Sequence, residues 1–234
     1  MSRRANARSF DLASGTVREL NAALHRLDPT ASYHWRILNP KGRHSIAAGL
    51  DVDATVEIEG HVGYYCAGMN KRATVLIKGN AGVGVAENLM SGVVHVQGDA
   101  SQSAGATANG GLLIIDGSAS ARCGISLKGA DIVVRGSIGH MSAFMAQAGT
   151  LVVLGDAGEA LGDSIYEARL FVRGKVQSLG ADCIEKKLED KHRKELHALL
   201  ERSGIAGQVD IGEFRRYGSA RRLYNFHVDN ASAY

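Results

Sequence analysis

The sequence contains few cysteines, and their arrangement predicts neither a disulfide nor a metal site. Only Cys66, Cys123 and Cys183 occur in 234 residues. Cys66 and Cys123 occupy equivalent positions of a repeat described below, three repeats apart. That separation is about 14 Å, whereas a disulfide requires Cα atoms within ~7 Å. No two cysteines have metal-ligand spacing. We therefore expect structural roles for all three and a reducing, cytoplasmic environment.

Targeting and membrane-spanning segments are also lacking. Residues 1–9 are basic and polar, so we expect a mobile tail there, and no apolar stretch of the secretory type follows. No run of eighteen apolar residues could span a bilayer. The net charge of +3 is small and spread out, which gives no reason to expect nucleic acid. Hydrophobic residues make up 45% of the chain, which is ample for one folded domain.

One basic cluster near the C-terminus is an exception to this even distribution of charge. Its residues are Arg215, Arg216, Arg221 and Arg222, interleaved with Phe214, Tyr217, Tyr224 and Phe226. The cluster could form a patch for RNA or another anionic ligand, or a tail that docks on a protein. We favour the docking tail, because no known nucleic-acid-binding motif accompanies the cluster.

A glycine recurs every nineteen residues and closes a short apolar segment each time. The seven glycines are Gly60, Gly79, Gly98, Gly117, Gly136, Gly155 and Gly174. A β-branched residue lies two positions before each glycine, and another apolar residue lies four positions before it. This alternation is typical of a strand with one buried face. A fixed period of this length indicates a repeat architecture.

Two further columns of small residues appear when the repeats are aligned. Alanine or glycine lies seven residues after each repeat glycine, from Ala67 to Ala181, and thirteen residues after each of the first six, from Ala73 to Ala168. Small residues on three sides of each repeat suit tight corners or close contacts between stacked rungs. We predict an all-β solenoid, a three-sided β-helix of about seven 19-residue rungs.

The length of the repeat also bears on the type of β-helix. Left-handed β-helices of the acyltransferase type keep a six-residue step and eighteen residues per rung, so nineteen favours the right-handed form. A Ca²⁺-binding roll needs an aspartate in every rung. Here aspartate follows the repeat glycine only at Asp99 and Asp156.

Helices are expected at both ends of the coil. Thr16 and Glu19 have the spacing of a capping box, and apolar residues at helical spacing follow. Asp182 and Glu185 give a similar signal for a second helix after the last rung. We expect the two helices to cover the open ends of the solenoid, with docking on a partner as the alternative. The predicted domains are an N-terminal tail and capping helix (residues 1–40), the β-helix (41–181), and a C-terminal helix with a docking tail (182–234).

Residues with the spacing of a catalytic or metal site are not found. His61, His95 and His140 fall in three different repeat columns, and His192 and His197 are five residues apart on a predicted helix, so neither set shares a face. Residues 82–84 lack the glycine and lysine of a phosphate-binding loop. Nothing pairs a base or nucleophile with the remaining candidate carboxylates, Asp131, Asp156 and Asp163. We therefore assign no catalytic, cofactor-binding or metal-binding residue to this chain.

Two stretches depart most from the repeat. They are residues 64–66 with 69–72, and residues 139–142 with 144–145. Tyrosine and methionine on a flat sheet would suit a protein interface. Core packing is the alternative, and we favour it for any one of these side chains.

The repeat segments resemble a known family of β-helix domains. The segments ending at Gly60, Gly79, Gly136 and Gly155 are Val-Glu-Ile-Glu-Gly, Val-Leu-Ile-Lys-Gly, Ile-Val-Val-Arg-Gly and Leu-Val-Val-Leu-Gly. They resemble the GXGXG domain at the C-terminus of the glutamate synthase large chain, over roughly residues 40–181. The β-helix subunit of formylmethanofuran dehydrogenase shares this domain. Residues 16–24 and 219–226 look like split, three-subunit relatives, notably the β-helix subunit of N-methylglutamate synthase and GlxC-type proteins.

The resemblance implies a structural subunit without catalytic residues in a cytoplasmic, hetero-oligomeric enzyme containing multiple copies. The implied partners are a class II glutamine amidotransferase-like subunit and a glutamate synthase-like subunit that binds FMN, with or without an iron–sulfur cluster. Such a complex would convert glutamate and methylamine to N-methylglutamate and ammonia, a transferase reaction. Two alternatives remain: the β-helix subunit of a formylmethanofuran dehydrogenase-type or formyltransferase-type complex, and a stand-alone β-helix acyltransferase or lyase.

Overall fold

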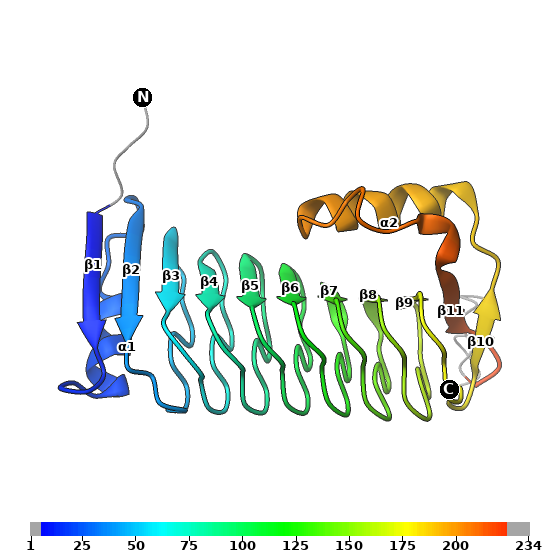
Figure 1. Ribbon diagram of the computed structural model, residues 1–234, viewed down its shortest axis with the longest axis horizontal. Helices are drawn as coiled ribbons and strands as arrows, with labels where there is room; N and C mark the ends of the chain where they lie inside the picture. Colours follow the sequence, from blue (N-terminus) through cyan, green and yellow to red (C-terminus); the bar gives the residue numbers. More distant parts are fainter. Residues whose placement is uncertain (1–5, 224–234) are drawn as a thin grey trace, which may run out of the picture.

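The computed structural model describes residues 6–223, which form one eleven-stranded sheet with two α-helices and a short 3-10 helix (Figure 1). The first six strands are β1 (Asn6–Asp11), β2 (Tyr33–Leu38), β3 (Ala54–Ile58), β4 (Thr74–Ile77), β5 (Val93–Val96) and β6 (Leu112–Ile115). The others are β7 (Lys128–Val134), β8 (Ala148–Val153), β9 (Arg169–Val172), β10 (Cys183–Lys186) and β11 (Arg215–Ser219). The helices are α1 (Val17–His25), α2 (Asp190–Arg202) and η1 (Ile211–Glu213). The predicted β-solenoid of about seven rungs is confirmed.

Strands β3 to β9 stack in parallel with a register of nineteen residues. Val56 pairs with Val75, which pairs with Val94, and the same step continues to Leu170. The two apolar positions of each repeat point into the coil and are almost completely buried, as at Val56 and Ile58. The core is therefore a stack of aliphatic layers, one from each rung.

The other two sides of the coil are built differently. A column of parallel bridges runs two residues after each repeat glycine, from Val62 to Val176. The remaining side is a series of turns, in which residues five, seven and nine positions after the glycine adopt left-handed backbone, for example Tyr65, Ala67 and Met69. Backbone hydrogen bonds still join adjacent rungs there, such as Tyr65 N–H to the Val83 carbonyl at 2.9 Å. The coil thus has three sides, and only one of them is a regular sheet.

The repeat glycines are required by the close approach of successive rungs. From Gly79 to Gly174 none has a left-handed backbone, yet a Cβ at any of them would overlap the preceding repeat glycine or a side chain beside it. At Gly136, for example, the Cβ would lie 2.7 Å from the Gly117 carbonyl oxygen. Real Cβ atoms do not occupy such positions. The nineteen-residue spacing therefore marks the line along which the backbone of each rung lies directly on the next.

The residue after each of the first six repeat glycines supports this close stacking with a side-chain acceptor. Asp99 Oδ1 accepts the Ser118 N–H at 2.7 Å, and Asp156 Oδ1 accepts the Lys175 N–H at 2.7 Å. Equivalent side-chain acceptors continue the series through His61, Asn80, Ser118 and Ser137. The two aspartates therefore belong to a ladder that satisfies backbone donors at the corner.

The N-terminal segment closes one end of the coil and begins earlier than predicted. Residues 6–9 belong to β1, which pairs in parallel with β2, so the expectation of a mobile tail is wrong for them. The capping box of α1 is confirmed, with the Glu19 N–H donating to Thr16 Oγ1. The Asn21 side chain bonds the Ser45 carbonyl and the Ala47 N–H, in the turn segment before β3 that stacks on the rung of Tyr64 and Gly68. Because Leu20 and Leu24 join the core, α1 covers the interior of the coil at this end.

The C-terminal segment departs further from the prediction. The residues after Asp182 form strand β10 and not the start of a helix, and α2 begins only at Asp190. The Asp182 carboxylate accepts the Ser219 hydroxyl at 2.5 Å and the Arg222 N–H at 3.0 Å, so it ties β10 to β11. Strand β11 pairs antiparallel with both β9 and β10 and continues the sheet past the last rung.

Helix α2 lies along the outer face of the sheet and does not cover the end of the coil (Figure 1). Its Leu196, Leu199 and Leu200 pack on outward-facing residues of β6 to β9 in a second apolar cluster that includes Val133 and Phe171. The outward positions of these strands are apolar for this reason. Neither helix within residues 6–223 has the length and apolar character to cross a membrane.

Candidate functional site

The histidines and cysteines considered as candidates do not gather at one site, and His61, His95 and His192 make structural contacts. His95 Nε2 lies 2.9 Å from Asp116 Oδ1, which also contacts Arg135 Nε at 3.2 Å, so this ion-pair group links adjacent rungs on the outer face. His192 is buried at the start of α2, whereas the side chain of His197 is 54% exposed. The three cysteines are unpaired and buried. Among the described residues, no group of three or more His, Cys, Asp or Glu side chains could hold a metal ion.

The candidate carboxylates also stabilise the fold. Asp131 Oδ2 accepts a hydrogen bond from Arg202 at 2.7 Å, which fixes the end of α2 to the sheet. Asp163 accepts the Ser164 hydroxyl at 2.8 Å and the Ala181 N–H at 3.1 Å. With Asp156 in the corner ladder, each candidate has a contact that explains its presence.

Exposed apolar side chains gather on the side of the coil made of turns. We call this side the turn face; it comprises positions four to eleven after each repeat glycine from Gly60 to Gly155, and residues 178–180 of the last rung, before β10 begins. Of the nine large hydrophobic side chains exposed within residues 6–223, seven lie on the turn face. They are Tyr64, Tyr65, Met69, Met90, Met145, Tyr166 and Leu179. Core packing, which the sequence favoured at the irregular stretches, is therefore wrong for Tyr64, Tyr65, Met69 and Met145.

The two ends of the turn face differ in shape. At the N-terminal end, Tyr64 stacks on His44 with ring centroids 4.5 Å apart, and Tyr65 meets Tyr64 edge-on at 6.4 Å. Toward the other end, Met145 and Tyr166 line an open hollow of about 550 Å³ with mostly apolar walls. Large flexible or aromatic side chains of this kind are enriched where proteins meet.

The basic cluster predicted near the C-terminus is divided by the fold. Phe214 is buried against the α2 cluster and Tyr217 in the solenoid core, so they are not stacking platforms for bases. Tyr224 and Phe226 lie outside the described residues. Arg216 and Arg221 line one pocket, whereas Arg222 lies at another depression beside Leu223. A single basic and aromatic patch is therefore not formed by the described residues.

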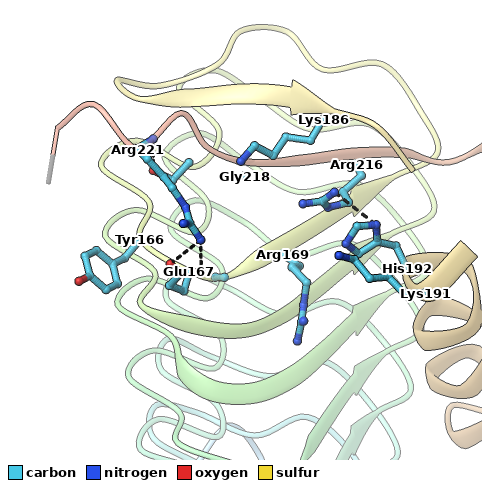
Figure 2. A pocket seen from close by; sticks show the side chains of 11 residues that line it. Tyr166, Glu167, Arg169, Lys186, Lys191, His192, Arg216, Gly218 and Arg221 are labelled. Carbon is cyan, nitrogen blue, oxygen red and sulfur yellow. Dashed lines mark hydrogen bonds and ion pairs between the residues drawn. The ribbon is translucent and has the colours of Figure 1, made fainter. Parts of the chain in front are cut away.

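The pocket that contains Arg216 and Arg221 lies among β9, β10, β11 and the start of α2. It has a volume of about 320 Å³ and is lined by Tyr166, Glu167, Ala168, Arg169, Lys186, Lys191, His192, Arg216, Gly218, Ser219 and Arg221. Figure 2 shows the Lys186 and Arg216 side chains on neighbouring strands, between Arg221 on one side and His192 on the other. We call it the basic pocket. The sequence cluster indicated two of its arginines, but the other cations come from β9, β10 and α2.

His192 connects the basic pocket to helix α2. Its Nδ1 accepts the Glu189 N–H at 3.2 Å and lies 3.3 Å from an Arg216 guanidinium nitrogen. Burial lowers the pKa of His192, and the positive charges of Arg216 and Lys191 lower it further. Nδ1 of the neutral imidazole thus faces both donors with its single lone pair.

The fold and surfaces define the class of this protein: a β-solenoid with a helix on the outer face of its sheet and an apolar turn face. No protein-family model matches the chain. The chain is 59% identical over 226 residues to Protein GlxC of Rhizobium meliloti (strain 1021), and the alignment covers 96% of this chain and 99% of that protein. The chain therefore belongs to the GlxC family.

Proposed function

We propose that the chain is a non-catalytic structural subunit of a glutamate synthase-like enzyme, most specifically of N-methylglutamate synthase. In this role it holds an amidotransferase-like subunit and an FMN-binding, glutamate synthase-like subunit in a fixed arrangement in the cytoplasm. The proposal rests on the resemblance of the repeat to the glutamate synthase β-helix domain and on the membership of the GlxC family. FMN belongs to the partner in this proposal, and no residue of this chain is assigned to it.

The observation that carries the proposal is the concentration of exposed apolar side chains on the turn face. Met69, Met90 and Met145 are 44–53% exposed, although the opposite, sheet-bearing side carries ion pairs or is covered by α2. An apolar side on a regular rod is typical of a surface that becomes buried in an assembly. The rungs are stacked rigidly, so the turn face can bind other subunits without the entropic cost of ordering its backbone.

Co-purification from the native host tests the proposal. The tagged chain is expected to bring down an amidotransferase-like and a flavin-containing synthase-like protein, and the complex is expected to convert glutamate and methylamine to N-methylglutamate. A metal-dependent amidohydrolase-like partner would instead support the formyl-transferring alternative. Turnover by the isolated chain, or a colourless homo-oligomer without partners, would refute the structural role.

A pair of charge substitutions locates the contact. Met145→Glu places a carboxylate on the turn face, where the parent side chain is 44% exposed, and is expected to weaken binding of a partner at least about tenfold. Ile184→Glu is the matched control, because Ile184 is 43% exposed but lies on β10, outside the turns that make up the turn face. Equal binding by the two variants would show that the turn face is not the contact surface.

A further inference from the structure

Ion pairs balance only part of the positive charge of the basic pocket. Arg221 pairs with Glu167 at 3.0 Å, Arg169 with Glu195 at 2.9 Å and Lys191 with Glu189 at 3.2 Å. Lys186 and Arg216 have no carboxylate in contact among residues 6–223. The Arg216 guanidinium contacts only neutral acceptors there, the Lys187 carbonyl at 2.9 Å and His192. The pocket therefore contains two cations without a carboxylate of the described residues in direct contact, although Glu189 and Glu195 interact with Arg216 at longer range.

The sheet register brings these two cations together. Lys186 on β10 and Arg216 on β11 are direct cross-strand partners, and both side chains line the pocket. Like charges directly opposite one another destabilise a sheet. Arg216 Nε is also buried without a hydrogen-bond partner in the part of the chain that the structure describes. Burial lowers the pKa of Arg216, in keeping with the unfavourable position of its charge. The contacts of Arg216 with the Lys187 carbonyl and His192 are neutral and do not offset the repulsion between the two cations.

A glycine leaves space beside the two cations. Gly218 lies two residues after Arg216 on the same face of β11, and a Cβ there would lie 3.6 Å from Lys186 Cδ and 3.7 Å from the Ala168 carbonyl oxygen. These are ordinary contacts, so alanine fits, but a larger side chain would occupy the pocket. The pocket volume of about 320 Å³ is at the lower end of the range for small-molecule sites.

We infer that the basic pocket binds a small oxyanion with two negative charges, held by Arg216 and Lys186. The planar guanidinium suits two oxygens of a phosphate or carboxylate group, and the lysine adds a point charge from the opposite strand. A bound dianion removes the repulsion between the two cations. A phosphate-bearing molecule and a dicarboxylate share this chemistry. The site shares Tyr166 with the turn face, but its two cations lie on β10 and β11, so anion binding can be tested separately from the assembly proposed above.

Calorimetric titration of the full chain at low ionic strength tests the inference, with inorganic phosphate and succinate as separate probes. Saturable binding of at least one probe is expected. Lys186→Met keeps the aliphatic part of the side chain and removes the charge, and should weaken binding about tenfold or more. Gly218→Val should prevent binding by filling the pocket, whereas Gly218→Ala should retain it. Lys175→Met, at an exposed lysine outside the pocket, is the charge control.

Thermal melting without ligand separates this role from a purely structural one. If Lys186 binds an anion, Lys186→Met relieves its repulsion with Arg216, so the ligand-free variant should be at least as stable as the parent. Its melting temperature should no longer rise when the probe is added. Binding of phosphate alone or of succinate alone would each support the site and identify the ligand class. The inference is refuted if neither probe binds the folded parent at about 10 mM, or if Lys186→Met binds as tightly as the parent.

Discussion

Gly117→Ala tests why a glycine recurs every nineteen residues. An alanine Cβ at this position would overlap Asp99 Oδ1 and lie 2.9 Å from both the carbonyl carbon and the oxygen of Gly98. Neither neighbour can withdraw freely. The Gly98 carbonyl accepts the Gly117 N–H at 3.0 Å, and Asp99 Oδ1 accepts the Ser118 N–H at 2.7 Å. The added methyl must therefore displace backbone or break a bond of the corner ladder.

The size of the effect follows from these two contributions. Overpacking against fixed backbone costs about 1–3 kcal/mol. Loss of the Asp99 to Ser118 hydrogen bond adds about 1 kcal/mol. The free energy of unfolding should therefore fall by about 2–4 kcal/mol, and for a chain of this length the melting temperature should fall by about 5–15 °C.

Calorimetric melting measures this change, with Gly218→Ala as the control. The chemical change is the same, but the new Cβ at position 218 meets its neighbours at 3.6 Å or more, so we expect a shift of less than about 2 °C. Equal shifts for the two variants, or a Gly117→Ala protein within about 2 °C of the parent, would show that rung contact does not explain the repeat.

Two further predictions concern the buried titratable groups. Burial raises the pKa of the Cys123 and Cys183 thiols to about 12, so the native protein at pH 8 should resist iodoacetamide, whereas the denatured chain should react at all three cysteines; rapid native labelling would contradict their burial. Because the pKa of His192 is lowered from 6.5, the unfolded chain binds the proton more readily, and stability should be lost as the pH falls below about 6.5. His192→Gln should lose less stability between pH 7.5 and 5 in urea unfolding, and an unchanged loss would assign it to other groups.

The fold was predictable because one periodic requirement outweighs local variation in sequence. The repeat glycines and the paired apolar positions directly reflect rung contact and the inward face, so they mark every rung from Gly60 to Gly174. The sequence pattern did not distinguish the physical reasons for small residues at two different columns of the repeat. At the repeat glycine the cause is close approach of backbone to backbone. At the column that includes Gly105 and Ala67 it is lack of space in the core, because Ala67 is fully buried and a Cβ at Gly105 would lie 2.6 Å from Ile132 Cδ1.

The ends were less predictable because no repeat constrains them. Asp182 has the residue type and position of a helix cap, yet its carboxylate bonds Ser219 and Arg222. That partnership joins residues far apart in sequence, which local patterns do not reveal. Residues 6–9 similarly form a strand because β2 offers an edge, not because their own composition favours one. The basic pocket was missed for the same reason, since its cations come from four elements.

The rung spacing fixes the distance between residues along the turn face. Met69 and Tyr166 lie on the same side, five rungs apart, and a rung spacing of about 4.8 Å separates them by about 24 Å along the axis. Because each rung is fixed to the next by backbone bonds, this length does not vary as a flexible linker would. Gain or loss of one nineteen-residue unit would change the distance between two docked bodies in steps of about 4.8 Å. Gain or loss of whole repeats can thus change the distance between two bound partners without altering the surface that contacts either of them.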